Sequence, residues 1–327
     1  MIRYTAFVNT DAPALVELWN RQSGRRSLTQ PMALLVLEEC VFGKPYFDRH
    51  GLVVAREDDR VVGFAHAGFA VSADGLRLSR EAGAVHLLVV AEHPQRESIA
   101  RGLLAAGESY LVQQGASTLW AGCTLPAHGF YLGLYGHSES PGVLESDADS
   151  LALFREAGYT EVEHHTVLQR PLANFRPPVD RKQVQLRRLY HVESEANPPV
   201  ASWLEAWRLE PFERVHHRLF MRGAAEPCGS VRVRYREPVP GDPRPDVLSL
   251  EDLHVPAERR GQGLGAFLLA EALRTAQAKG LTLAEVQVSQ HNPPALTLFR
   301  KLGFQPIDRG WVLRKAGGGQ PGPGPGG

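Results

Sequence analysis

The segment 259–265, Arg-Arg-Gly-Gln-Gly-Leu-Gly, contains the residue types of an anion-binding turn. A strand-like run precedes it and a helix-like run follows it. The first N–H groups of a helix lack intrahelical partners and carry partial positive charge, so they favour phosphate. Glycine lets the backbone approach a ligand without a Cβ in the way, and Arg259 and Arg260 add positive charge. We expect a phosphate or diphosphate group to bind here; the alternative is a loop that only needs glycine at positive φ.

Two common phosphate-binding motifs do not fit this spacing. A P-loop requires Gly, four residues and then Gly-Lys-Ser/Thr, whereas Gly265 is followed by Ala266 and Phe267. The dinucleotide motif is Gly-x-Gly-x-x-Gly near the start of a βαβ unit, whereas the turn here reads Gly-x-Gly-x-Gly and lies late in the chain. The spacing therefore argues against an enzyme that depends on ATP or NAD.

The turn resembles the acyl-CoA-binding signature of the GNAT superfamily of N-acetyltransferases, which is Gln or Arg, two residues, Gly, one residue, then Gly or Ala. Arg260, Gly263 and Gly265 occupy its fixed positions. The segment 292–304 resembles the Asn-x-x-Ala-x-x-Leu-Tyr-x-x-x-Gly-Phe stretch of the same family, with matches at Asn292, Ala295, Leu298, Gly303 and Phe304. The resemblance covers residues 183–315 well and the first half of the chain weakly.

This resemblance implies acetyl-CoA as the acyl donor, no metal, and direct attack of an amine on the thioester without an acyl-enzyme. Two splayed parallel strands, here 249–255 and 283–289, are implied to hold the pantetheine arm, and the glycine turn the pyrophosphate. The protein then has to accept the proton of the amine, orient the reactants and protonate the leaving thiolate. The implied cofactor-binding residues are Leu253, Val255, Arg260, Gly261, Gln262, Gly263, Leu264, Gly265, Asn292 and Phe299.

Glu251 is our candidate for the general base, because it lies on the strand that leads into the pyrophosphate turn, where many family members place one. Alternation along a strand predicts that Glu251 and Leu253 share one face and that Asp252 and His254 lie on the other. The alternative is a carboxylate on the surface of the strand. The general acid is where this sequence departs from the family, since Phe299 occupies the usual Tyr position and cannot donate a proton.

The first half of the chain reads as a degenerate copy of the second. A spacing of 165 residues relates Gln95 to Arg260 and Ala100 to Gly265, and the two helices that follow match at a spacing of 145. Ser98 replaces the glycine that lets the backbone approach phosphate, and His86 occupies the position of Glu251. We therefore expect the first half to be structural or to shape the substrate site; the alternative is a second working site.

The elements that position these residues follow from periodicity and from proline and glycine. Both halves show strands and amphipathic helices in the order of a mixed α/β sheet. We expect two tandem GNAT-like domains: a degenerate domain at 1–172, a Pro-rich linker at 173–182, an acetyl-CoA-binding domain at 183–316, and a disordered Gly/Pro tail at 317–327. The insertion 126–147 is expected to line the acceptor pocket, to seal the domain interface, or simply to pack.

Composition restricts the remaining possibilities. The 36 basic and 36 acidic residues balance, which argues against nucleic-acid or membrane partners. Three cysteines without a CxxC pair favour a reducing, cytoplasmic location, and His128 and His137 lack metal-binding spacing. We expect a cytoplasmic N-acetyltransferase, monomeric or homodimeric, that acts on a small-molecule or peptide amine. The alternative is a non-catalytic acyl-CoA-binding or regulatory module.

Overall fold

The structure is a computed structural model that describes residues 1–22, 24–72, 76–122, 129–134, 141–177, 179–236 and 246–317. The predicted tail lies outside these residues except at Gly317. Within the predicted insertion 126–147, only 129–134 and 141–147 are described, so His128 and His137 are also outside.

The first half contains the helices and strands that its periodicity predicts. An Asp58-Asp59 turn connects two antiparallel strands, as the alternation on either side of it indicates. The strands are β1 (Ile2–Ala6), β2 (Leu52–Glu57), β3 (Arg60–Val71), β4 (Leu78–Val90), β5 (Thr118–Ala121), β6 (Val143–Leu144) and β7 (Thr160–Pro171). The α-helices are α1 (Ala12–Asn20), α2 (Leu34–Leu37), α3 (Arg96–Gln113) and α4 (Ala148–Glu156).

The second half repeats this order. Its strands are β8 (Tyr190–Ala196), β9 (Glu213–Met221), β10 (Pro227–Tyr235), β11 (Val247–His254), β12 (Leu283–Ser289) and β13 (Gln305–Ala316). Its α-helices are α5 (Arg181–Leu189), α6 (Trp203–Leu209), α7 (Leu264–Ala278) and α8 (Pro293–Lys301). Six of these elements were not predicted from the sequence, because each is short and none shows a long apolar period. They are β1, α2 and β6 in the first half and α5, β8 and α6 in the second.

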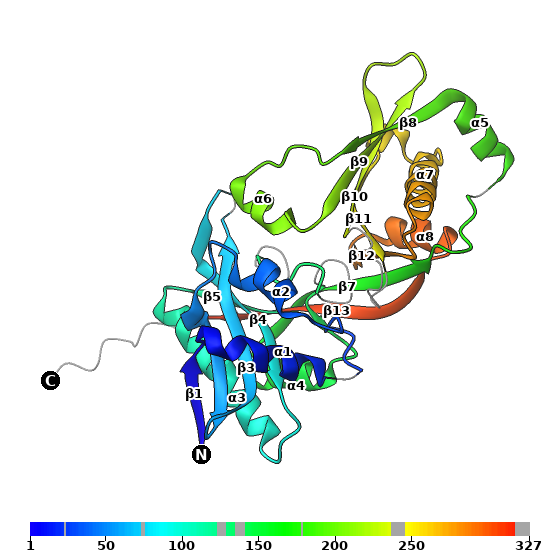
Figure 1. The fold of residues 1–327 in the computed structure, drawn as a ribbon. Coiled ribbons are helices and arrows are strands. Elements are labelled where there is room, and N and C mark those ends of the chain that lie inside the picture. Colours follow the sequence, from blue (N-terminus) through cyan, green and yellow to red (C-terminus); the bar gives the residue numbers. More distant parts are fainter. Residues whose placement is uncertain are drawn as a thin grey trace.

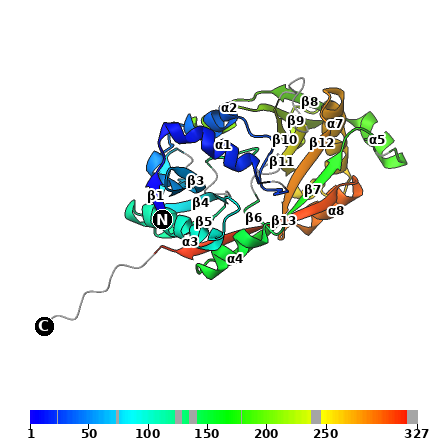
Figure 2. The ribbon, with the colours of Figure 1, turned by 60° about the horizontal axis from the view of Figure 1, so that its bottom comes forward.

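The two halves share one continuous sheet through an exchange of their last strands. The order along the sheet is β1-β2-β3-β4-β5-β13-β7-β12-β11-β10-β9-β8, with β6 paired to β13. Strand β7, from the first half, pairs antiparallel with β12, whereas β13, from the second half, pairs antiparallel with β5. Figures 1 and 2 show β7 in green and β13 in red running side by side between the halves. The division of the chain at 173–182 stays a prediction.

Helices cover the sheet on both faces in the first half. The buried residues of α1 and α2 pack with Leu87 and Val89 of β4. Those of α3 and α4 pack with Leu88 and Val90 on the other face. In the second half, α7 and α8 share one core with strands β10 to β12. The other face of the sheet in the second half is therefore covered by fewer helices from that half.

Contacts between the halves cover part of this open face. Leu132, from the described part of the insertion, is buried with Leu209 and Phe212 of the second half. Lys44 Nζ donates to the backbone oxygen of Trp207 at 2.5 Å, and the Arg236 guanidinium lies 3.0 Å from the Cys40 thiol. The described part of the insertion thus helps to seal the interface between the halves.

Candidate functional site

A split between two parallel strands of the second half opens a cavity. Strands β11 and β12 pair only from Val247 with Leu283 to Ser249 with Glu285. Beyond this point residues of both strands line a cavity of about 770 Å³. Peptide groups that no longer pair across the split are available to a ligand inserted between the strands. This is the splayed strand pair that the resemblance implies.

A bulge interrupts β11 at the predicted base. Arg232 pairs with Glu251 and Ser230 with His254, so two steps on β10 oppose three on β11, and Asp252 has a φ of 42°. Leu253 packs against the same core as Leu250. The predicted alternation, with Glu251 and Leu253 on one face, was therefore wrong, because an extra residue in a bulge reverses the facing of the residues after it. Glu251 and Leu253 both line the cavity.

The glycine turn begins α7, as predicted, and its glycines are required for two different reasons. Gly263 is the N-cap of α7 with a φ of 84°, and Gly261 has a φ of 75°, values that side-chain-bearing residues rarely adopt. A Cβ on Gly265 would instead lie 3.3 Å from Leu298 of α8. The first two glycines therefore shape the turn, and the third permits α7 and α8 to pack closely.

Polar side chains brace this turn. Arg260 Nε donates to the Val255 carbonyl at 3.0 Å, and Gln262 donates to the Glu258 carbonyl at 3.3 Å. Lys182, near the start of α5, donates to the Gly261 carbonyl at 3.2 Å. The sequence analysis missed Lys182, since nothing in its local pattern connects it with a turn about 80 positions later. It places an additional ammonium group beside the predicted phosphate site.

Glu251 forms an ion pair with Arg234 of β10, whose side chain is 1% exposed, against 22% for Glu251. The Arg234 guanidinium also lies over the Phe212 ring at 4.9 Å. Charge-assisted hydrogen bonds to a rigid guanidinium fix a carboxylate strongly. Arg234 was not predicted, although an Arg within the strand-like run Val231–Tyr235 was an available signal.

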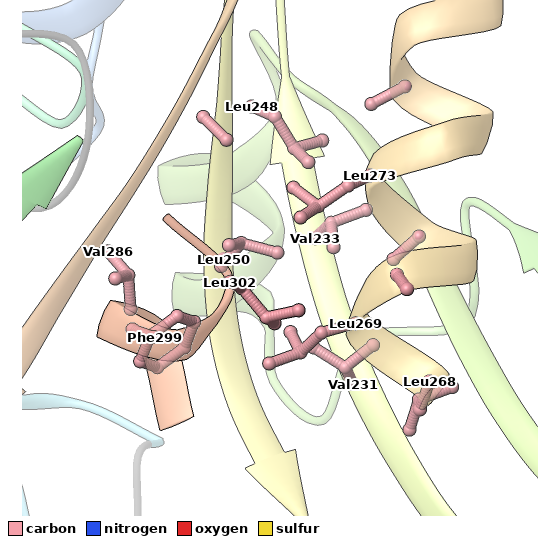
Figure 3. Close-up of a cluster of buried hydrophobic side chains, with 14 of the residues drawn as sticks. Val231, Val233, Leu248, Leu250, Leu268, Leu269, Leu273, Val286, Phe299 and Leu302 are labelled. Atoms are coloured by element: carbon pink, nitrogen blue, oxygen red, sulfur yellow. The ribbon is translucent and has the colours of Figure 1, made fainter. Parts of the chain in front are cut away.

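Asn292, Ala295 and Phe299 of the second predicted motif line the same cavity. Asn292 is the N-cap of α8, where its side-chain oxygen accepts from the Ala295 N–H at 3.2 Å. Phe299 is buried and meets Phe304 edge-on with ring centroids 5.2 Å apart. Figure 3 shows Phe299 on α8 near Val286 and Leu250. Asn292 therefore has a structural role as a cap, and Phe299 gives the cavity an apolar wall without a proton donor.

The equivalent cleft of the first half carries ion pairs. A smaller cavity of about 200 Å³ is lined by Leu88, Val90 and Ala100, the counterparts of Leu253, Val255 and Gly265. Arg96 and Asp149 form an ion pair across it at 2.5 Å, joining α3 to α4. Arg25 and Arg101 line the same cavity, so its acids and arginines balance. The expectation that the first half is structural or shapes the substrate site stays a prediction.

His86, the counterpart of Glu251, is 1% exposed and packs within an aromatic cluster. Its ring lies 5.3 Å from that of Phe130 and 5.5 Å from that of His66. Burial lowers the pKa of His66 well below its usual value, and His86 adds to this shift. The Tyr131 hydroxyl lies 2.9 Å from His66 Nδ1. These contacts are those of a packed core.

The described residues include neither a metal-binding cluster nor a membrane-spanning helix. They contain no group of three or more His, Cys, Asp or Glu that could hold a metal ion. Within the same ranges, no helix is both long and apolar enough to span a bilayer.

Comparisons with known proteins agree with this geometry. The model of the acetyltransferase (GNAT) family matches twice, at residues 12–134 and 184–304. A putative phosphinothricin acetyltransferase of Bacillus subtilis is 36% identical over 64 residues, which are 20% of this chain and 39% of that protein. An uncharacterized N-acetyltransferase of Methanocaldococcus jannaschii is 28% identical over 69 residues, 20% of this chain and 30% of that protein. The chain therefore aligns with well under half the length of these curated relatives.

The fold of the whole chain matches a solved tandem structure. A tandem GNAT protein from the clavulanic acid biosynthesis pathway superimposes with a TM-score of 0.67 at 16% identity. The match covers 98% of this chain and 100% of that one, so the double-domain fold is common to both.

Proposed function

Because the chain belongs to the GNAT family of acetyltransferases, we propose that it transfers the acetyl group of acetyl-CoA to a primary amine, with the donor bound in the second half. The acceptor in this proposal is a small-molecule or peptide amine. One observation supports the assignment to the second half. The split between β11 and β12 and the N-terminus of α7, which begins at positive-φ glycines, border the same region, and Glu251 lines the adjoining cavity.

The residues of the second half fit the donor. Gly261 has nothing within 4 Å of where a Cβ would lie, among the described residues, so the turn leaves room for a phosphate against its backbone. The N–H groups at the start of α7 and the Lys182 ammonium group would hold the pyrophosphate. Backbone groups of Leu253 and Val255 would hold the pantetheine arm, and Phe299 would contact its apolar end. Leu253 and Phe299 line the cavity.

In this proposal Glu251 receives the proton that the attacking amine loses. Arg234 holds the carboxylate at the wall of the cavity, which keeps it positioned for a substrate bound there. The amine nitrogen forms the new bond to the acyl carbon as the carbon–sulfur bond breaks, and the thiolate leaves. Phe299 cannot protonate that thiolate, so its proton comes from water or from another group.

The test is the substitution Glu251→Gln, which keeps the hydrogen bond to Arg234 but removes the proton acceptor. We expect kcat for amine acetylation to fall by about two orders of magnitude, the usual worth of a general base, while the Kd for acetyl-CoA stays within about twofold. A non-catalytic acyl-CoA-binding module predicts instead that the unsubstituted protein binds acetyl-CoA but acetylates none of a broad set of amines. That outcome would make the alternative the better description.

A further inference from the structure

The first half of the chain forms one wall of the cavity that contains Glu251. Trp120 of β5 and Glu163 and His165 of β7 line this cavity together with residues of β11 and β12. They reach it because β7 is exchanged into the sheet beside β12, with His165 paired to Ser289. A cavity that belongs to the second half by its donor-binding elements is therefore closed by the first half.

Glu163 is placed at the end of this wall nearest the split strands. The Ser289 hydroxyl, on the last residue of β12, donates to the Glu163 carboxylate. His165 Nε2 lies 3.5 Å from the same carboxylate, and the Glu163 side chain is 33% exposed. The carboxylate is thus positioned by its neighbours and still accessible from the cavity.

Among the described residues, Glu163 does not form an ion pair with an arginine, whereas Glu251 and Asp252 of β11 each do. Glu251 is paired with Arg234, and Asp252 with Arg232 at 3.0 Å. Within the described ranges, the side-chain partners of Glu163 are a hydroxyl and an imidazole. A hydroxyl carries no charge, and an imidazole, unlike a guanidinium, does not carry a permanent charge. Of Glu163, Glu251 and Asp252, Glu163 is consequently the acid best suited to attract a cation.

We propose that Glu163 binds the ammonium group of the acceptor, so that the first half selects the acceptor for the site in the second half. A primary amine has a pKa near 10 and arrives as an ammonium ion in neutral water, by analogy with the lysine side chain. Trp120, Val162 and Leu209 add apolar surface to the same cavity, which favours an alkyl or arylalkyl substituent on the amine. This inference rests on the proposed function in taking this cavity as the acceptor site.

The experiment measures a preference for charge, which does not require turnover. Binding of 2-phenylethylamine and of the uncharged analogue 2-phenylethanol is measured by calorimetry on the full chain, with and without saturating CoA. We expect the amine to bind at least about tenfold more tightly than the alcohol, and Glu163→Gln to reduce this ratio to near one. Glu161→Gln is the matched control, because Glu161 lies on the same strand and pairs with Arg155.

Two further variants separate charge from folding. Glu163→Asp keeps the charge and should retain most of the preference, and Ser289→Ala removes only the neutral partner and should retain all of it. The inference is overturned if the wild-type protein shows no preference for the amine, if Glu163→Gln keeps the preference, or if Glu251→Gln is the variant that abolishes it.

Acetylation of 2-phenylethylamine is assayed separately, so the two proposals can fail independently. A Glu163-dependent preference without any acetylation of this or other amines keeps the binding inference and rejects the proposed function. Acetylation with a preference that does not depend on Glu163 does the opposite.

Discussion

The Glu251 carboxylate is bound by the guanidinium of Arg234, a side chain that is 1% exposed on the neighbouring strand β10. The pair therefore connects the interior of the second half with the wall of its cavity. An arginine at this depth is stabilised by its partner and by the Phe212 ring at 4.9 Å. The position of the Glu251 carboxylate and the stability of the second half consequently both depend on this ion pair.

Removal of Arg234 should destabilise the fold as well as displace Glu251. Arg234→Met is expected to lower the free energy of unfolding by about 3 kcal/mol, since it leaves a partly buried carboxylate without its cation. Glu251→Gln added to Arg234→Met should recover part of this loss, because the remaining group is neutral. Urea unfolding of the single and double variants measures both effects. A single variant within about 0.5 kcal/mol of the wild type would contradict this account of the pair.

Substitution of Gly263 should remove donor binding without a general effect on the fold. Glu at this position has to adopt a φ of 84° and places a carboxylate at the start of α7, where the pyrophosphate is proposed to bind. We expect calorimetry to give one acetyl-CoA site per chain for the wild type and no measurable binding for Gly263→Glu.

The matched control for Gly263 is Gly158→Glu, because Gly158 has a φ of 88° but lies in the first half, after α4. It imposes a similar backbone strain and should leave binding unchanged. Two sites per wild-type chain would show that the ion pairs of the first-half cleft do not prevent binding there.

Lys182 should contribute to donor affinity through its charge. Its ammonium group lies beside the Gly261 carbonyl, and a Cβ on Gly263 would lie 3.0 Å from its Cε. We expect Lys182→Met to weaken binding of CoA about three- to tenfold at low salt, and by less at 0.5 M NaCl, where screening reduces exposed charge interactions. Lys301→Met, at the other end of α8 from Asn292, should have no effect. Equal loss for both variants would indicate a general charge effect.

The conformation of the proposed donor side of the site was largely predictable from the sequence, because it depends on local structure. Gly261 and Gly263 need positive φ, Asn292 caps a helix, and the helix and strand on either side of the turn are strongly periodic. Phe299 has no hydroxyl because of its residue type, and it is buried among apolar side chains. Each of these features is determined within a few residues of the position itself.

The proposed acceptor side could not be predicted, because it depends on which strands pair. No local pattern in β7 indicates that it pairs with β12 and not with a strand of its own half. The same holds for Lys182 beside Gly261, which joins residues 79 positions apart in the chain. The bulge at Asp252 adds one residue to β11 and so reverses an alternation that was otherwise correctly predicted.

A buried histidine of the second half should make the fold sensitive to acid. His217 of β9 is 2% exposed, with Nδ1 2.8 Å from the Ser194 hydroxyl. Burial lowers its pKa from 6.5 to about 4, and the charges of His216 and Lys279 act in the same direction. Between these two values the unfolded chain binds a proton that the folded chain does not, so stability is complete above about pH 6.5 and falls as the pH drops toward 4.

From this shift we expect His217 to account for about 2 kcal/mol of stability lost between pH 7.5 and 5.0. His217→Gln should reduce the difference in unfolding free energy between these two pH values by about that amount, whatever its effect at pH 7.5. His66, whose pKa is also lowered by burial, should leave part of the acid sensitivity in place. The exposed His291→Gln is the control, and urea unfolding at both pH values provides the measurement. An unchanged pH difference in His217→Gln would mean that this histidine is protonated in the folded chain as readily as in the unfolded one.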